Sequence, residues 1–133
     1  MRQIFIILFL TLFAFWNVQR INAQGIEFYH GSWEEAKANA KKSSKLIFVD
    51  AFAQWCGPCK RMAANVFTLQ SVGDYFNSSF INLKMDMEAS EAATFRDQYP
   101  VSAYPTLFFI DSEGKVVRQV VGGQTEEGLL SIA

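Results

Sequence analysis

The stretch LIFVDAFAQWCGPCK, residues 46–60, joins an apolar run to a pair of cysteines. Its first part, residues 46–53, is apolar except for Asp50. A near-continuous apolar run of this length is typical of a parallel-type strand that is buried on both faces of a sheet. The second part places Pro58 near a helix start, where a proline costs no helical hydrogen bond. The stretch therefore predicts a central strand followed at once by a helix that runs to about Ala64.

The cysteine pair predicts redox chemistry. Cys56 and Cys59 are the only cysteines, and a loop this small removes too little chain entropy to stabilise a fold. A helix start offers unpaired N–H groups and a partial positive charge, which favour a thiolate. We expect Cys56, at the helix tip, to be the exposed nucleophile, and Cys59, one turn further in, to be better shielded. Cys59 would then attack the mixed disulfide and release the reduced substrate.

Two other uses of the cysteines remain as alternatives, an inert disulfide and a metal site. Structural zinc takes four ligands, and beyond the cysteines the chain offers one histidine, His30, far away in sequence. We interpret His30 as an ordinary loop residue, and we expect neither a bound metal nor an organic cofactor.

The rest of the chain alternates between strand and helix patterns. Ser32 and Glu35 form a capping-box pattern at the start of a helix. Asp111 and Gly114 bound a hairpin turn between two strands, and Thr125 is placed to cap a last helix. The expected strands are residues 26–29, 46–53, 80–87, 106–110 and 115–121. A helix is expected over residues 90–99, and residues 71–77 are either a second short helix or the far half of a broken one. In the third of these strands, Asn82, Lys84 and Asp86 alternate with Ile81, Leu83 and Met85, which predicts one polar and one apolar face.

This order predicts an α/β fold in which a mixed central sheet carries helices on both faces. One domain over residues 24–133 accounts for the length. The final helix has only about eight residues before Ala133, which is short for covering a sheet face. We therefore expect either a fragment or a domain that is completed by something else.

The first 23 residues predict a signal peptide. Arg2 precedes an apolar run over residues 4–16 that is too short to span a bilayer. Cleavage is expected after Ala23, giving a protein that begins at Gln24 and is periplasmic or secreted. The alternative is an uncleaved segment that anchors the protein in a membrane. The formal net charge of −1 and the absence of a Lys/Arg run argue against a nucleic-acid partner.

The segment Trp55-Cys56-Gly57-Pro58-Cys59-Lys60 resembles the active-site signature of the thioredoxin family. Three further matches support the resemblance: Asp50 resembles the family's buried acid, Tyr104-Pro105-Thr106 its cis-proline loop, and Val121-Gly122 its last strand and glycine. The resemblance covers about residues 27–133. The segment over residues 66–86 looks closer to exported thioredoxin-like domains, including those of membrane electron-conducting proteins, than to cytosolic thioredoxin.

The chain departs from the family pattern at two places. Ala64 stands where thioredoxins usually have the proline that kinks the helix, so we expect the break near Asn65 or later. The lysine that commonly faces the buried acid would fall near Asn82, and Lys84, on the same face of that strand, is the expected substitute.

The resemblance implies a thioredoxin fold and a protein-disulfide reductase, with Cys56, Cys59 and Asp50 as catalytic residues. Burial would raise the pKa of Asp50 and let it exchange a proton with Cys59. The residues expected to contact the substrate are Trp55, Gly57, Pro58, Tyr104 and Pro105. The expected partners of this monomer are disulfide-containing proteins and an upstream thiol electron donor, for which a membrane protein is one candidate. The alternatives are a disulfide oxidase or isomerase and a partner-binding module.

Overall fold

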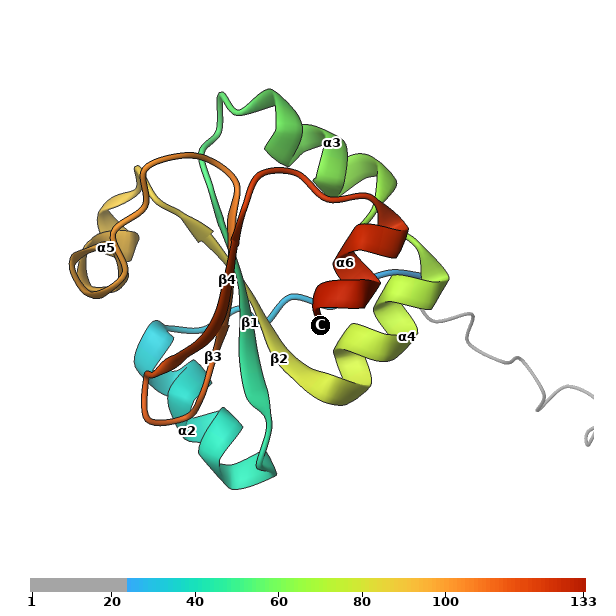
Figure 1. Cartoon of the computed structure of the whole chain (residues 1–133). Helices are drawn as coiled ribbons and strands as arrows, with labels where there is room; N and C mark the ends of the chain where they lie inside the picture. Colours follow the sequence, from blue (N-terminus) through green and yellow to red (C-terminus); the bar gives the residue numbers. More distant parts are fainter. Residues whose placement is uncertain (1–23) are drawn as a thin grey trace, which may run out of the picture.

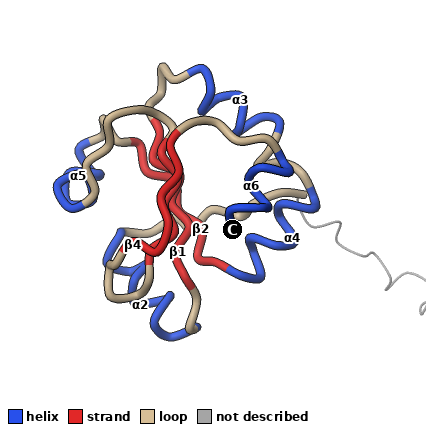
Figure 2. The backbone as a smooth tube through the Cα atoms, viewed as in Figure 1, coloured by secondary structure: helices blue, strands red, loops and turns tan. Residues whose placement is uncertain are grey.

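A four-stranded mixed sheet forms the centre of the computed structural model, which describes residues 24–133 (Figure 2). The strand order is β2-β1-β3-β4. Strand β1 pairs in parallel with β2 and antiparallel with β3, and β3 pairs antiparallel with β4. The bounds are Leu46–Phe52 for β1, Phe80–Asp86 for β2, Thr106–Ile110 for β3 and Val116–Val121 for β4. The predicted mixed sheet is therefore confirmed.

Helices cover both faces of this sheet (Figure 1). Helix α2 (Trp33–Ser43) and helix α5 (Ala93–Gln98), with a short 3₁₀ turn before α5, lie on one side. On the other side lie α3 (Gly57–Asn65), α4 (Gln70–Ser79) and α6 (Glu126–Ile132). This arrangement confirms the predicted helices on both faces of the sheet. It also places the start of α3 shortly after the end of the central strand β1.

Two hydrophobic clusters hold the layers together. The cluster under α2 and α5 is built around Trp33, whose ring packs edge to face on Phe95 and Tyr99. The cluster under α3, α4 and α6 centres on Phe48, whose ring lies 4.8 Å from that of Phe76. Strand β1 contributes to both clusters, which confirms that it is buried on both faces.

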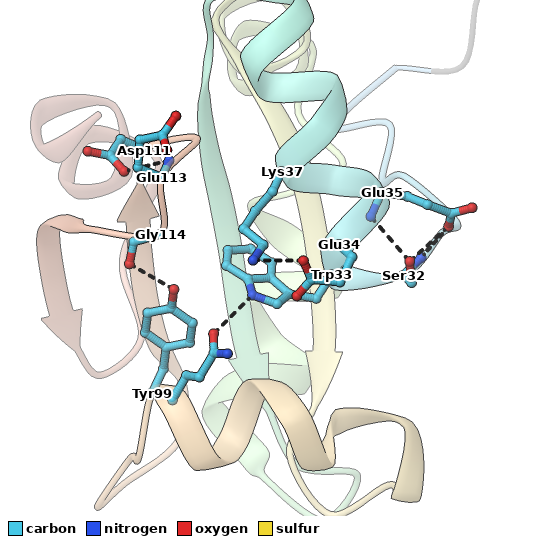
Figure 3. Close-up of polar contacts among 10 residues, drawn as sticks. Ser32, Trp33, Glu34, Glu35, Lys37, Tyr99, Asp111, Glu113 and Gly114 are labelled. Carbon is cyan, nitrogen blue, oxygen red and sulfur yellow. Dashed lines mark hydrogen bonds and ion pairs between the residues drawn. The ribbon is translucent and has the colours of Figure 1, made fainter.

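Polar contacts fix α2 at its start and along its side (Figure 3). The Ser32 hydroxyl accepts the Glu35 N–H, and the Glu35 carboxylate accepts the Ser32 N–H, so the predicted capping box is confirmed. The Trp33 indole donates to the Gln98 side chain, which ties α2 to α5. The Tyr99 hydroxyl donates to the Gly114 carbonyl at 2.8 Å and so ties the end of α5 to the β3–β4 hairpin.

The strand predicted over residues 26–29 is absent from the structure. Two backbone hydrogen bonds hold this extended segment, from Ile26 N–H to the Phe67 carbonyl and from Tyr29 N–H to the Asn82 carbonyl. Because the two bonds go to different parts of the chain, no ladder forms. Within residues 24–133, β2 is consequently an edge strand.

Other predicted elements need smaller corrections. The two faces predicted for β2 are present, because Ile81, Leu83 and Met85 pack in the cluster under α2 and α5. On the opposite face Asn82 is buried, and its amide donates to the Phe76 carbonyl and the Asn77 side chain. The helix predicted over residues 90–99 is divided into the 3₁₀ turn Ser90–Ala92 and α5. Thr125 caps α6 through the Gly128 N–H, as predicted.

The predicted signal peptide, residues 1–23 with cleavage after Ala23, lies outside the described residues. From residue 24 onward, the structure contains no helix that is both long and apolar enough to span a membrane.

Candidate active site

The cysteine pair lies where β1 gives way to α3. Cys56 is the N-cap residue of α3, and its sulfur accepts the Cys59 N–H at 3.2 Å. Pro58 occupies the first turn, where its missing N–H leaves no helical bond unmade. The two cysteines form a disulfide, and their Cα atoms are 5.3 Å apart. The predicted helix start at the motif is therefore confirmed.

The predicted difference in exposure between the cysteines is wrong for this disulfide form. Cys56 is 2% exposed and Cys59 is 4% exposed, so both are buried. Each sulfur covers the other, and Ala53, Phe52 and Tyr104 pack around the pair. The surface of the motif is made instead by Gly57, which is exposed, and Pro58, which is half-buried.

Asp50 is a buried carboxyl on the central strand, with 1% of its surface exposed. Within the described chain, neither carboxyl oxygen has a hydrogen-bond partner. The nearest cation is the Lys84 ammonium, 3.9 Å from Oδ2. Burial raises the pKa of Asp50 to about 6, and the positive charge of Lys84 limits the rise. The predicted direction of this pKa shift is confirmed.

Lys84 is the lysine that faces the buried acid. The β1–β2 register pairs Asp50 directly with Lys84, whereas Asn82 pairs with Phe48. The proposed substitution of Lys84 for the family lysine thus matches the geometry. The break expected in the helix near Asn65 is also present, because α3 ends at that residue and α4 begins at Gln70.

The loop before β3 lies against the cysteines. The Tyr104–Pro105 bond is cis, as the resemblance predicts. Tyr104 packs on the cysteine cluster, and Pro105 is buried. The Pro105 carbonyl accepts the Gly122 N–H at 2.8 Å, so this loop is held to the end of β4. Gly122 has a φ of +100°, which a residue with a side chain rarely adopts.

Trp55 is 68% exposed, yet two contacts hold its ring in place. Its ring lies edge to face on Tyr104 at 5.8 Å, and its indole N–H donates to the Glu88 carboxylate. The preceding Gln54 side chain donates to Asp86 at 2.9 Å. The roles of Asp86 and Glu88 as partners of Gln54 and Trp55 have no signal in the sequence, because no local pattern connects residues more than 30 positions apart.

The structure thus brings together seven of the predicted site residues from two segments of the chain: Cys56, Cys59, Trp55, Gly57, Pro58, Tyr104 and Pro105. The eighth, Asp50, lies on β1, the strand that leads into the motif. His30 is exposed and lies in a loop. From residue 24 onward, no three His, Cys, Asp or Glu side chains gather as metal ligands.

Comparisons with known proteins agree with this geometry. The thioredoxin family model matches residues 28–133. Thioredoxin H4 of Arabidopsis thaliana is 38% identical over 95 residues, which cover 71% of this chain and 75% of that protein. The thioredoxin of Streptomyces clavuligerus is 32% identical over 94 residues, covering 71% of this chain and 81% of that protein.

A solved structure is similar as well. A Bacteroides thetaiotaomicron protein that has been suggested to be a disulphide-isomerase is 50% identical and superposes with a TM-score of 0.72. The match covers 83% of this chain and 91% of that chain. The family match, the relatives and the paired cysteines lead to one conclusion: the chain belongs to the thioredoxin family and is a thiol–disulfide oxidoreductase.

Proposed function

We propose that this protein reduces disulfides in exported proteins through the dithiol form of Cys56 and Cys59. The proposed direction of electron transfer, from the protein to the substrate, rests on one observation. Gly57 and Pro58, between the cysteines, bear no charge, and Pro58 has no N–H to donate. The reduced thiolate would therefore receive less stabilisation than in strong oxidants, and a pair whose reduced form is less stabilised is a better electron donor.

The first step is attack on the substrate. The Cys56 thiolate, at the N-cap of α3, attacks one sulfur of the substrate disulfide. A bond forms between the Cys56 sulfur and that substrate sulfur, and the substrate S–S bond breaks. The other substrate sulfur leaves as a thiolate, which takes up a proton from water.

The second step releases the substrate. Cys59 gives its thiol proton to Asp50, and the resulting thiolate attacks the Cys56 sulfur. The mixed disulfide breaks, the second substrate thiolate leaves, and the Cys56–Cys59 disulfide remains. The substrate has gained two electrons and the protein has lost two. A carboxyl with a pKa of about 6 is suited to this exchange, since it holds and releases a proton close to neutral pH.

The surface around the cysteines would hold the substrate chain. Trp55, Gly57 and Pro58 would line one side of this surface, and Tyr104, in the loop that also holds the buried Pro105, would line the other. We propose that an extended substrate segment lies between them, with its disulfide over Cys56. The Glu88 and Tyr104 contacts of Trp55 support this role, because they hold an exposed ring in a fixed place.

The proposed setting is a periplasm or another exported compartment, because residues 1–23 have the pattern of a signal peptide. Regeneration of the dithiol there requires an upstream thiol donor, and a membrane protein could supply it from the cytosolic side. We propose that the protein acts as a monomer, with no bound cofactor.

A direct assay of direction tests the proposal. Reduced protein is mixed with an oxidised disulfide protein, and free thiols in the substrate are measured over time. We expect thiols to appear in the substrate as the Cys56–Cys59 disulfide forms, and the Cys56→Ser variant to be inactive. If no thiols appear in the substrate and the disulfide form rapidly oxidises a reduced substrate, the protein is an oxidase and the proposed reductase activity is wrong.

Isomerase activity is a second candidate, favoured by one comparison. The Bacteroides thetaiotaomicron protein suggested to be a disulphide-isomerase shares 50% of its residues with this chain in the match. Recovery of activity from a scrambled, fully oxidised substrate distinguishes the candidates, because an isomerase rearranges disulfides without net reduction.

A further inference from the structure

Lys84 lies among three aromatic rings. Its ammonium nitrogen is 4.7 Å from the ring centre of Phe52, 5.6 Å from that of Phe28 and 5.8 Å from that of Phe67. All three distances are within the range in which a cation is attracted to the negative face of an aromatic ring. Phe52 belongs to β1, Phe28 to the extended segment over residues 26–30, and Phe67 to the turn after α3. We refer to Phe28, Phe52 and Phe67 as the aromatic enclosure.

The enclosure explains how a flexible side chain keeps its place. The Lys84 side chain is 31% exposed, so water competes with Asp50 for its ammonium group. An ion pair at 3.9 Å gives little on its own to hold a long side chain, because ordering that chain costs entropy. The rings attract the ammonium and limit its movement. Phe28 and Phe67 also pack on each other at 5.4 Å, which gives the enclosure a fixed wall.

We propose that the aromatic enclosure positions the Lys84 ammonium beside Asp50 and thereby sets the pH range in which Asp50 carries its proton. Phe52, the ring closest to the ammonium, is the main positioning residue. The inference rests on the proposed function for its consequence, since Asp50 matters to catalysis only if it exchanges a proton with Cys59. The titration of Asp50 can be measured without any assay of activity.

The other charged groups around this pair are already engaged or exposed. Asp86 follows Lys84 on the same side of β2, and its carboxylate accepts hydrogen bonds from Gln54 and from the Glu88 N–H. Within residues 24–133, the only ion pair of Lys84 is with Asp50. The other charged or titratable groups nearby lie on the extended segment and on α3. They are exposed or half-buried, and none makes an ion pair with Asp50. These groups are Glu27, Tyr29, His30, Lys60 and Arg61. Cys56 and Cys59 do not titrate while they form the disulfide.

The test follows the Asp50 carboxyl by NMR as the pH of the oxidised, full-length protein is changed. In Phe52→Leu the titration midpoint should move to higher pH by about half a unit or more, because burial persists while the ammonium is held less well. The control is Phe80→Leu, which removes a buried ring on β2 that does not contact Lys84. This control should leave the midpoint in place.

A second variant, Lys84→Met, shows whether Phe52 acts by positioning the Lys84 ammonium or by keeping water away from Asp50. In Lys84→Met, the midpoint should already be raised, and adding Phe52→Leu should raise it no further. An equal shift from Phe52→Leu in both backgrounds would mean that the ring acts by excluding water, and it would overturn the inference. An unchanged titration midpoint of Asp50 in the single variant Phe52→Leu would also overturn the inference. If the midpoints move as expected but the rate of disulfide reduction does not, the enclosure stands and the role of Asp50 in the proposed function fails.

Discussion

Replacing Asp50 by asparagine should stabilise the protein at neutral pH and leave its stability nearly unchanged in acid. Asp50 is almost fully buried, and its pKa is raised from 3.8 to about 6 by loss of contact with water. Asparagine has nearly the same shape and no charge, so it removes the cost of burying a carboxylate.

The size of the effect follows from proton linkage. The two pKa values differ by about 2.2, and each pKa unit corresponds to about 1.4 kcal/mol, so the full penalty is about 3 kcal/mol. Below pH 3.8 the carboxyl is protonated in both states and costs nothing. Between pH 3.8 and about 6 the unfolded chain binds fewer protons than the folded chain, so stability falls as pH rises. Above about pH 6 the whole penalty is present.

Urea unfolding of the oxidised protein at pH 4 and pH 8 measures this difference. The Asp50→Asn variant should exceed the unsubstituted protein by about 2 to 3 kcal/mol at pH 8 and by a few tenths of a kcal/mol at pH 4. Its rate of disulfide reduction at neutral pH should fall by about tenfold or more, since the proton acceptor is lost. If the variant and the unsubstituted protein differ in stability by the same amount at pH 4 and pH 8, the raised pKa of Asp50 is refuted. If the variant reduces disulfides at an unchanged rate across pH 6 to 9, Asp50 has only a structural role.

Three further predictions concern other parts of the chain. Cys59→Ser should trap a mixed disulfide between Cys56 and a substrate, as seen on non-reducing gels, whereas Cys56→Ser should trap little; equal trapping would argue against separate roles. Amino-terminal sequencing of exported material should begin at Gln24, and an intact Met1 in the membrane fraction would indicate an anchor instead. Ser32→Ala removes the α2 cap and should lower the free energy of unfolding by about 1 kcal/mol, whereas no loss would mean that the cap is not needed.

The sequence allowed prediction of those parts of the fold whose signals are local. The apolar run around Asp50, the Ser32 cap and the turn at Gly114 each specify an element through neighbouring residues, and each element is present. The strand expected over residues 26–29 is absent for a physical reason, because a strand needs a partner strand and the only backbone–backbone bonds of this segment go to Phe67 and Asn82, in separate parts of the chain.

Side-chain environments were harder to predict. The alternation in β2 places Asn82 on the polar face of the strand but does not reveal its burial, because the Phe76 carbonyl that accepts its amide comes from α4. The expected exposure of Cys56 failed because the disulfide and Tyr104 cover its sulfur. The contacts of Trp55 with Glu88 and of Lys84 with three rings join distant segments, and only the folded chain reveals them.

The redox potential of the Cys56–Cys59 pair decides whether this pair donates or accepts electrons. The protein is equilibrated with glutathione buffers of known ratio, and the dithiol and disulfide forms are separated after alkylation. The uncharged Gly57–Pro58 pair predicts a potential near that of thioredoxin itself, roughly −270 mV. A potential above about −180 mV, in the range of isomerases and oxidants, would contradict the reductase while leaving the fold and the cysteine pair intact.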